Sequence, residues 1–452
     1  MTGIDEALAR AAVEATLAAG ASDAEAYASE ATEREVRVHA GEVESLTAAT
    51  QRGIGVRAWI GGRVGYAFGA NLAQDGIGAV AARAAESARA ADEDEFAGPP
   101  QPEAGEPPSI DLMDPSILDW TSDEAAELAL AVERAALEAD SRVATVEIAV
   151  CAGVLERVAI ASSTGIGGGY EASSCDAYTQ VLARGESGSE TGLGFGLARG
   201  PAHLDPLAIG REGAERATAM IGARKPDSRT CPIVLDPTVA ASFAGLLGKV
   251  LGADALQRGR SPFAERLGDS VAGEAFSLHD DGLDPDGPAS SPFDDEGVPR
   301  RRTALIESGV LRAHLHDTYT ARRGGAASTA SAGRSGYRSL PGVSASNLVV
   351  APGTLGFEQL LAQAGDGVLV TDVVGLHSGV NPVSGVFSVG ASGRSIRDGG
   401  LAEPLREFTI AGDLVSMLGA VRAAGAESRW VPFGGSVSTP PLLIGEMAVS
   451  GS

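Results

Sequence analysis

The spacing of apolar side chains divides the first part of the chain into a helix followed by antiparallel strands. Over residues 4–19 the apolar positions recur at helical spacing and Gly20 follows them, which predicts a helix that ends there. From residue 23 the pattern changes to alternation, with Val36 and Val38 set between charged neighbours, as in a strand with one buried face. Apolar runs at 53–60 and 63–68 flank Gly61-Gly62, a dipeptide that predicts a tight hairpin.

The same patterns continue to residue 226. Residues 77–91 have helical spacing, and the acidic, proline-rich stretch 92–115 has the composition of a linker. Helices are predicted over 122–138 and 206–221, the second with Asp205 placed to cap it and Pro206 at its first position. Strands are predicted over 143–154, 158–161 and 177–182.

The second half of the chain mixes short strands with few helices. Strands are predicted at 232–235, 368–374, 386–389 and 443–447, and helices at 239–251, 357–364 and 414–423. We therefore expect an α+β fold, with an N-terminal α/β region of antiparallel hairpins and a larger β-rich C-terminal domain with a few helices. The expected segments are an N-terminal α+β domain (1–91), a linker (92–115), a middle α+β domain (116–226) and the C-terminal β-rich domain (227–452).

Composition narrows the classes of function. The 35 basic and 60 acidic residues give a net charge of −25, which argues against nucleic-acid binding because that affinity depends on Lys and Arg at phosphates. Residues 1–20 do not resemble a signal peptide, and no run approaches the roughly 18 apolar residues that a membrane span needs. Three widely spaced cysteines, Cys151, Cys175 and Cys231, suit a reducing compartment. We expect a soluble cytoplasmic protein that binds neither nucleic acid nor membrane.

The sequence offers no self-sufficient catalytic set. None of the six histidines belongs to an H-E-x-x-H, H-E-x-x-x-H or H-x-x-E-H motif, and G-x-S-x-G and S-x-x-K are also absent. His314 and His316 form the one close pair, and at that spacing they share a face only on a strand. We interpret them as polar surface or cleft residues, and we assign no catalytic and no metal-binding residue.

An acidic stretch at 279–297 raises the question of calcium. An EF-hand loop started at Asp284 would place Pro288 and Ala289 where a ligand and a glycine belong, so a solvated loop is favoured. Within the stretch, residues 292–297 (Pro-Phe-Asp-Asp-Glu-Gly) combine an apolar anchor, three acids and a glycine. This combination predicts a shaped turn beside a cleft.

Several segments in order resemble one family. Residues 291–297, 302–311 (Arg-Thr-Ala-Leu-Ile-Glu-Ser-Gly-Val-Leu) and 319–322 (Tyr-Thr-Ala-Arg) resemble the third domain of the TldD/PmbA peptidases. Residues 407–412 and 440–451 resemble its closing segments. Residues 20–25 and Gly53-x-Gly55-Val56-Arg57 resemble its first domain. The resemblance covers nearly the whole chain and implies a metallopeptidase family.

The chain departs from that family at its zinc site. The TldD-type subunit carries H-E-x-x-x-H on a helix after a strand, and a late cysteine, whereas the TldE/PmbA type lacks both. The corresponding helix here, 239–251, has no histidine or glutamate, and no cysteine follows Cys231. The resemblance therefore implies the metal-free type, with zinc in a TldD-like partner subunit and none in this chain. The helix keeps an apolar stripe that is expected in the core or at a subunit interface: Val239, Phe243, Leu246, Leu247, Val250 and Leu251.

The resemblance further implies a non-catalytic subunit of a heterodimeric peptidase, in which an unfolded peptide lies extended against a sheet edge. The residues expected at the peptide cleft or subunit interface are Asp294, Asp295, Glu296, Tyr319 and Arg322. Two alternatives stay open. One is a homodimer that binds peptides or regulates another protein without peptidase activity; the other is an independent hydrolase built on His314, His316 or His377.

Overall fold

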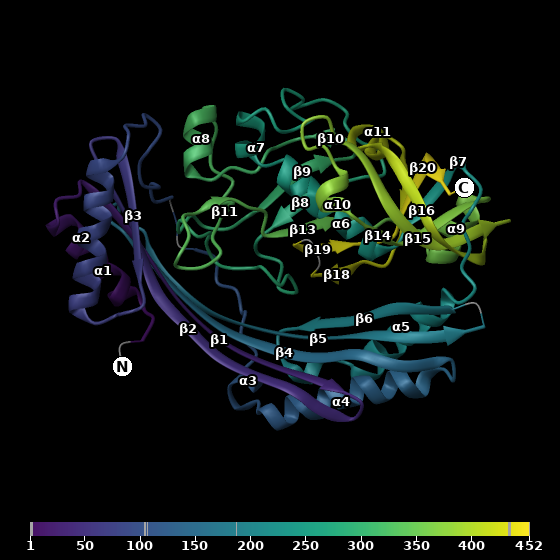
Figure 1. The fold of residues 1–452 in the computed structure, drawn as a ribbon. Helices are drawn as coiled ribbons and strands as arrows, with labels where there is room; N and C mark the ends of the chain where they lie inside the picture. The colour runs from purple at the N-terminus through teal and green to yellow at the C-terminus, as the bar shows by residue number, and fades with distance from the viewer. Residues whose placement is uncertain (1–2, 104, 106, 187, 433–434, 452) are drawn as a thin grey trace.

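A long, curved, fully antiparallel sheet forms one side of the molecule (Figure 1). The computed structural model describes residues 3–103, 105, 107–186, 188–432 and 435–451. The strand order is β3-β2-β1-β4-β5-β6. The strands are β1 (Asp23–His39), β2 (Glu42–Ile60), β3 (Arg63–Gly69), β4 (Val143–Ser162), β5 (Gly167–Gly185) and β6 (Gly188–Ala198). β1 pairs with β4 from Glu25 to Val38, so the first and middle segments of the chain share one sheet.

Helices cover the convex face of this sheet and the C-terminal domain lies on its concave side (Figure 1). α1 (Glu6–Ala18) and α2 (Gln74–Ala90) pack at the β1–β3 end, while α4 (Ser122–Ala139) and α5 (Pro206–Ala219) pack at the β4–β6 end. Small residues make the contacts close, because a Cβ on Gly65 would lie 2.1 Å from the backbone nitrogen of Ala88. The predicted cap is confirmed, since Asp205 accepts hydrogen bonds from the amides of Leu207 and Ala208, both 3.0 Å long.

The C-terminal domain is built around α6 (Pro237–Val250), which contacts strands of two different sheets. One sheet has the order β10-β9-β8-β13-β19-β18, and the other has the order β16-β15-β14-β7-β20-β17 and is closed by pairing of β16 with β20. The first contains β8 (Leu278–Asp281), β9 (Arg302–Glu307), β10 (Val310–Leu311), β13 (Asn347–Val350), β18 (Arg429–Val431) and β19 (Ser436–Thr439). The second contains β7 (Arg229–Leu235), β14 (Gly367–Val374), β15 (Val386–Arg397), β16 (Gly400–Asp413), β17 (Val421–Ala424) and β20 (Leu442–Ser450).

The apolar stripe of α6 lies in the core of this domain. Val239, Phe243, Leu247 and Val250 are buried, and Leu246 is half-buried against the same cluster. The stripe was expected in the core or at a subunit interface, and these four side chains lie in the core. The helix therefore stabilises the domain by burying apolar surface between its two sheets.

Short elements complete the domain, and the predicted α+β fold class is confirmed. They are α7 (Ala253–Gln257), α8 (Thr318–Gly324), β11 (Ala332–Gly333), β12 (Gly342–Val343), α9 (Phe357–Ala364), α10 (Leu376–Gly379) and α11 (Leu414–Gly419). The predicted helix over 414–423 is wrong in its last part, because Val421 pairs with Ile444 and begins β17. Among the described residues, no helix has both the length and the apolar character that crossing a bilayer requires.

The expected linker 92–115 lies against the rest of the protein along much of its length. After α2 it passes α8, where Tyr319 and Arg322 bind its backbone and side chains, and it reaches the short α3 (Ser116–Asp119). Leu112 is buried, and the amide of Asp114 donates a hydrogen bond of 2.8 Å to Ser173 Oγ in β5. We refer to the described part of residues 92–100 as the strap, because it joins the sheet to the C-terminal domain.

Candidate functional site

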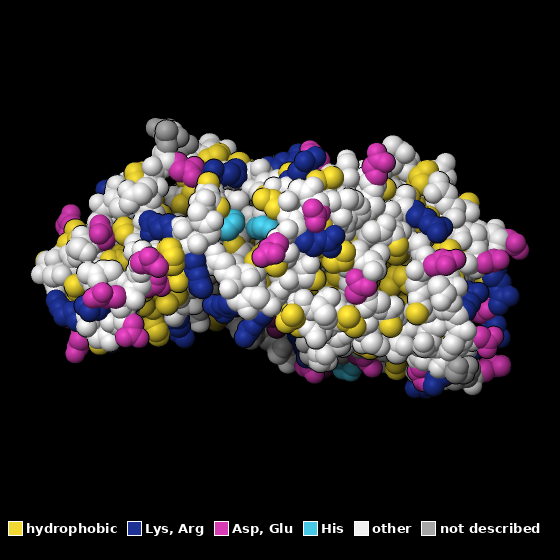
Figure 2. Space-filling model, turned by 90° about the horizontal axis from the view of Figure 1, so that it is seen from above, with side chains coloured by type: hydrophobic (Ala, Val, Ile, Leu, Met, Phe, Trp, Pro, Cys, Tyr) yellow, Lys and Arg dark blue, Asp and Glu magenta, His cyan; other side chains and the backbone are white. Residues whose placement is uncertain are grey.

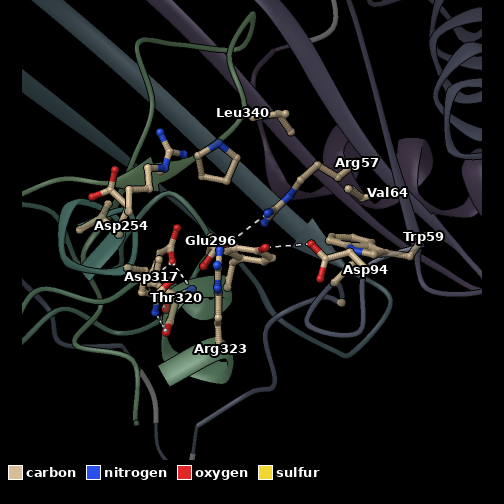
Figure 3. A pocket seen from close by; sticks show the side chains of 18 residues that line it. Arg57, Trp59, Val64, Asp94, Asp254, Glu296, Asp317, Thr320, Arg323 and Leu340 are labelled. Atoms are coloured by element: carbon tan, nitrogen blue, oxygen red, sulfur yellow. Dashed lines mark hydrogen bonds and ion pairs between the residues drawn. The ribbon is translucent and has the colours of Figure 1, made fainter. Parts of the chain in front are cut away.

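A cavity of about 270 Å³ lies where the β2–β3 end of the curved sheet meets the C-terminal domain (Figure 3). Its walls come from β2 and β3, the strap, α7, the turn at Glu296, α8 and the segment 340–343 that contains β12. Its lining side chains are Arg57, Trp59, Val64, Asp94, Ala97, Asp254, Gln257, Arg258, Glu296, Asp317, Tyr319, Thr320, Arg323, Leu340, Pro341 and Val343. The cavity thus combines charged groups with an aromatic and an aliphatic wall, as ligand sites in proteins do.

Arg57 is the central cation of this site. It is buried on β2, and its guanidinium binds Glu25 of β1 and Glu296 of the C-terminal domain. The bond from Nη1 to Glu296 Oε1 is 2.9 Å and the bond from Nε to Glu25 Oε1 is 3.0 Å. Burial alone would lower the pKa of Arg57, but the two carboxylates outweigh it and hold the pKa above its usual value. The pairs therefore fix a positive charge at the junction of the two halves.

Glu296 is held in place by a turn that Asp294 organises. Asp294 accepts hydrogen bonds from the amides of Glu296 (2.9 Å), Val298 (3.0 Å) and Ala332 (3.0 Å). The second carboxylate oxygen of Glu296 accepts a 2.9 Å bond from the amide of Thr318, at the start of α8. Burial raises the pKa of Glu296, but the charge of Arg57 and the hydrogen bond from Thr318 outweigh burial and hold the pKa below its usual value. Glu296 is therefore ionised and paired.

Asp295 and Arg334 extend the same network. Asp295 Oδ2 accepts a 2.6 Å bond from the amide of Arg334, whose Nε donates to the carbonyl of Asp295 at 3.1 Å. The guanidinium of Arg334 also pairs with Glu25 and lies over the ring of Tyr27, 5.0 Å from its centroid. Glu25 thus binds two arginines, one from each half of the protein, which ties β1 to the C-terminal domain.

α8 binds the strap through two side chains. Tyr319 Oη donates a 2.8 Å hydrogen bond to Asp94 Oδ2, and its ring meets that of Phe96 edge to face. Arg322 Nη1 donates a 2.7 Å bond to the carbonyl of Gly98, and Nη2 binds the carbonyl of Pro99. The strap therefore closes one side of the cavity.

The five residues expected at a cleft or interface gather around this cavity in two layers. Glu296 and Tyr319 line it, whereas Asp294, Asp295 and Arg322 lie behind its walls and hold the turn and the strap. Arg57, Trp59 and Asp317 line the cavity but were not among the expected residues. An arginine inside the apolar run 53–60 was the sequence signal for the first of them, because a charge there needs a buried partner.

The chemistry available here is recognition. Arg57 pairs with Glu296, and Tyr319 binds Asp94, so the cavity presents fixed charges and apolar surface. Asp317 caps α8 by accepting a 2.8 Å bond from the amide of Thr320, and burial together with Glu296 raises its pKa.

On the face of the molecule seen in Figure 2, acidic and basic side chains are interspersed.

His314 and His316 lie just after β10 and are half-buried. Nδ1 of each is buried without a hydrogen-bond partner, and burial lowers the pKa of both imidazoles. Among the described residues, no group of three or more His, Cys, Asp or Glu side chains is arranged to hold a metal ion. The side chain of His377 lies outside the described part of the chain.

α6 does not fit a zinc site of the kind that the family resemblance suggests for a TldD-type subunit. It follows β7 directly, as that site requires, but its buried positions are Val, Ala, Phe, Gly and Leu. None of these side chains can coordinate zinc, which takes thiolate, imidazole or carboxylate ligands. No step of catalysis can therefore be derived through a metal on this helix.

Comparisons with known proteins cover almost the whole chain. Residues 24–88, 115–221 and 228–451 match domain 1, the central domain and the C-terminal domain of the PmbA/TldA metallopeptidases. The metalloprotease PmbA of Escherichia coli O157:H7 is 28% identical over 439 residues, 96% of this chain and 94% of that protein. A PmbA homologue of Haemophilus influenzae is also 28% identical and covers 98% of this chain and 95% of its own.

Solved structures have the same fold. A candidate modulator of a DNA gyrase from Thermotoga maritima has a TM-score of 0.89, 24% identity, and coverage of 98% of this chain and 100% of its own. TldE from Thermococcus kodakarensis has a TM-score of 0.89, 22% identity, and coverage of 99% of both chains. At these identities the structural matches show the fold alone.

Proposed function

Because the chain belongs to the PmbA/TldD metallopeptidase family, we propose that it is the metal-free subunit of a two-subunit zinc peptidase that cleaves unfolded peptides. The observation that carries the proposal is α6, where ligand-free apolar side chains stand on the helix that bears the zinc ligands in a TldD-type subunit. In this proposal the partner supplies zinc and the carboxylate that activates water. This chain supplies part of the surface that binds the peptide.

The cavity beside β12 supports a role in holding peptide. Within the described part of the chain β12 pairs only with β11, so its second edge has no described strand beside it, and Gly342 and Val343 both line the cavity. An extended peptide can add to such an edge through main-chain hydrogen bonds, independently of its sequence. Trp59 and Leu340 offer apolar contact for its side chains. A folded substrate would not present an extended main chain of this kind.

Three buried cysteines, all free thiols, agree with a reducing compartment, and we place the complex in the cytoplasm.

Metal analysis and mixing test the proposal. The purified chain alone should contain no stoichiometric zinc and cleave no unfolded peptide such as casein. Addition of the H-E-x-x-x-H family protein from the same genome should give a stable complex with one zinc per pair and peptidase activity, and a chelator should abolish that activity.

Two outcomes would contradict the proposal. One zinc ion held tightly by this chain alone would show that it builds its own metal centre. A chain that ignores every H-E-x-x-x-H partner and instead forms a stable, inactive self-dimer would favour the homodimeric peptide-binding or regulatory protein. As a matched control, His314→Ala and His316→Ala should leave the activity of the complex unchanged, which separates the proposal from an independent hydrolase.

A further inference from the structure

The first half of β2 leaves a long edge of the curved sheet open. β1 pairs with β2 along its whole length, but β3 pairs only with the stretch from Ile54 to Ile60. On the other side of residues 42–51 no described strand lies next to β2. Ten residues at about 3.4 Å each make an edge of about 34 Å whose backbone groups have no partner strand.

From residue 45 to residue 51 this edge lacks the features that usually protect an open strand. All residues from 42 to 51 are exposed, and the segment 45–51 (Ser-Leu-Thr-Ala-Ala-Thr-Gln) contains neither proline nor a charged side chain. Open edges in stable proteins are commonly guarded by lysine, proline or a bulge, because they otherwise pair with other chains. The one bulge in the β1–β2 pair has Glu44 of β2 as its extra residue, next to the turn, so it leaves residues 45–51 regular.

Apolar side chains accompany the open backbone. Leu46 is paired with Val36 and Val43 with Val38, so these side chains share the convex face of the sheet. Val36 and Val38 are buried in the cluster beneath α4, whereas Leu46 is 52% exposed and Val43 48% exposed. The apolar layer of the sheet therefore continues past the cover of α4 and ends at the edge. An added strand would bury it.

The charges select the direction of that strand. Glu42 and Glu44 stand at one end of the edge, and the other residues up to Gln51 are uncharged. A parallel strand with the same pattern would place acids opposite acids, whereas an antiparallel one places them opposite uncharged residues. A subunit of the same fold carries an equivalent edge, because structures of this fold match over 98–99% of the chain. Two such edges related by a pseudo-twofold axis would meet antiparallel.

We propose that the open edge of β2 at residues 42–51 is the surface on which this chain pairs, strand to strand and antiparallel, with the equivalent edge of its zinc-bearing family partner. The inference rests on the proposed two-subunit function. It adds where the subunits meet: the two curved sheets become one, and the concave sides keep their cavities free for peptide.

The test uses the two full-length proteins. Leu46→Lys puts a charge on the apolar edge and should weaken the complex at least tenfold in Kd, measured by titration calorimetry. Leu207→Lys is the matched control, because Leu207 is 53% exposed on α5 and lies at the opposite side of the sheet. It should bind like the wild type. In hydrogen exchange, those amides of residues 43–51 that point away from β1 should slow when the partner is added.

The outcomes separate the edge proposal from the proposed function. If the wild-type proteins associate but Leu46→Lys binds equally well and the edge amides do not slow, the edge proposal is wrong while the proposed function stands. If the wild-type proteins do not associate at all, the proposed function fails and this inference falls with it. If the edge amides slow as the concentration of this chain alone rises, a second copy occupies the edge and the proposed partner is wrong.

Discussion

Arg57 and Glu296 show how single buried charges can hold two parts of a chain together. Arg57 comes from β2 and Glu296 from the turn before β9, and both are almost fully buried. A buried ion pair is not necessarily better than a pair of apolar residues, but removal of one partner leaves the other charge without compensation. The protein therefore loses stability when one partner of the buried pair is removed.

We expect Glu296→Gln to lower the free energy of unfolding by about 3 kcal/mol, because Arg57 loses one of its two carboxylates in a buried position. Urea unfolding followed by fluorescence measures this change. Glu171→Gln provides the control, since Glu171 pairs with Arg157 on the surface, where an ion pair contributes less than about 1 kcal/mol. Equal losses in the two variants would show that the buried network carries no special weight.

Asp280 predicts a pH dependence of stability. Its carboxylate is buried and accepts two 2.8 Å bonds from the amide and hydroxyl of Ser346, and burial raises its pKa to about 6. An unfolded aspartate has a pKa of about 3.9, so the folded protein holds the proton more tightly than the unfolded chain does. The resulting stabilisation is complete below about pH 4 and is lost as the pH rises through about 6.

Asp280→Asn keeps the shape but removes the titration. Relative to this variant, the wild type should lose up to about 3 kcal/mol of unfolding free energy between about pH 4 and pH 7. Urea unfolding at a series of pH values checks it. A difference that stays constant over this range would contradict the assignment to Asp280.

At the scale of elements, α8 acts as the clamp of the strap. Arg322 binds the carbonyls of Gly98 and Pro99, which have no strand or helix of their own to bind them. Arg322→Ala should release this segment and speed the exchange of the amides of residues 96–98 about tenfold, as expected when hydrogen bonds of this kind are lost. Arg211→Ala, at an exposed arginine on α5, should leave that exchange unchanged. Faster exchange over the whole chain would show global destabilisation instead.

Local patterns were sufficient to place many elements. The Gly61-Gly62 turn, the Asp205 cap and the helix at α6 occur where the sequence predicts them, because each depends on neighbouring residues. The strands predicted over 143–154 and 158–161 are instead one continuous strand, which runs through Arg157 to Ser162. Arg157 pairs with Glu171 of β5 and Glu30 of β1, partners that exist only once three strands have assembled. No local pattern contains this information.

The candidate site illustrates the same limit. The shaped turn at 292–297 could be expected from its own residues, but Arg57 and Glu296 are 239 positions apart and nothing in either segment identifies the other. Asp294 was expected at a cleft as an acid, whereas its three backbone hydrogen bonds show it as the organiser of the turn. The family resemblance assigned the segments to domains, but which of their residues contact one another became known only from the structure.

At the scale of the whole molecule, the curved sheet and the C-terminal domain share a core. Phe195 of β6 is buried in the core of the C-terminal domain, and the guanidinium of Arg429 lies over its ring, 3.8 Å from the centroid. Arg429 Nη2 also donates 2.8 Å bonds to the carbonyl of Phe195 and to Glu212 of α5. The two halves therefore meet at this end as well as at Arg57.

Phe195→Ala should lower the free energy of unfolding by about 3–5 kcal/mol, the usual loss for a buried phenylalanine, and should weaken the coupling of the two halves. Calorimetry should then show two separate transitions where the wild type shows one. Leu137→Ala is the control, because Leu137 is 44% exposed on α4, on the side of the sheet away from the C-terminal domain. A single transition in the Phe195 variant would mean that other contacts suffice to couple the halves.

The fourteen residue pairs between β1 and β4 have a consequence for access by substrates. A protein that encloses its substrate by domain closure needs a hinge. Here the first and middle segments of the chain form one continuous sheet, which leaves no hinge between them. The C-terminal domain contacts that sheet at both ends, at Arg57 and at Phe195. The cavity of about 270 Å³ between them therefore has fixed walls, and a swing of the C-terminal domain cannot widen it unless those contacts break.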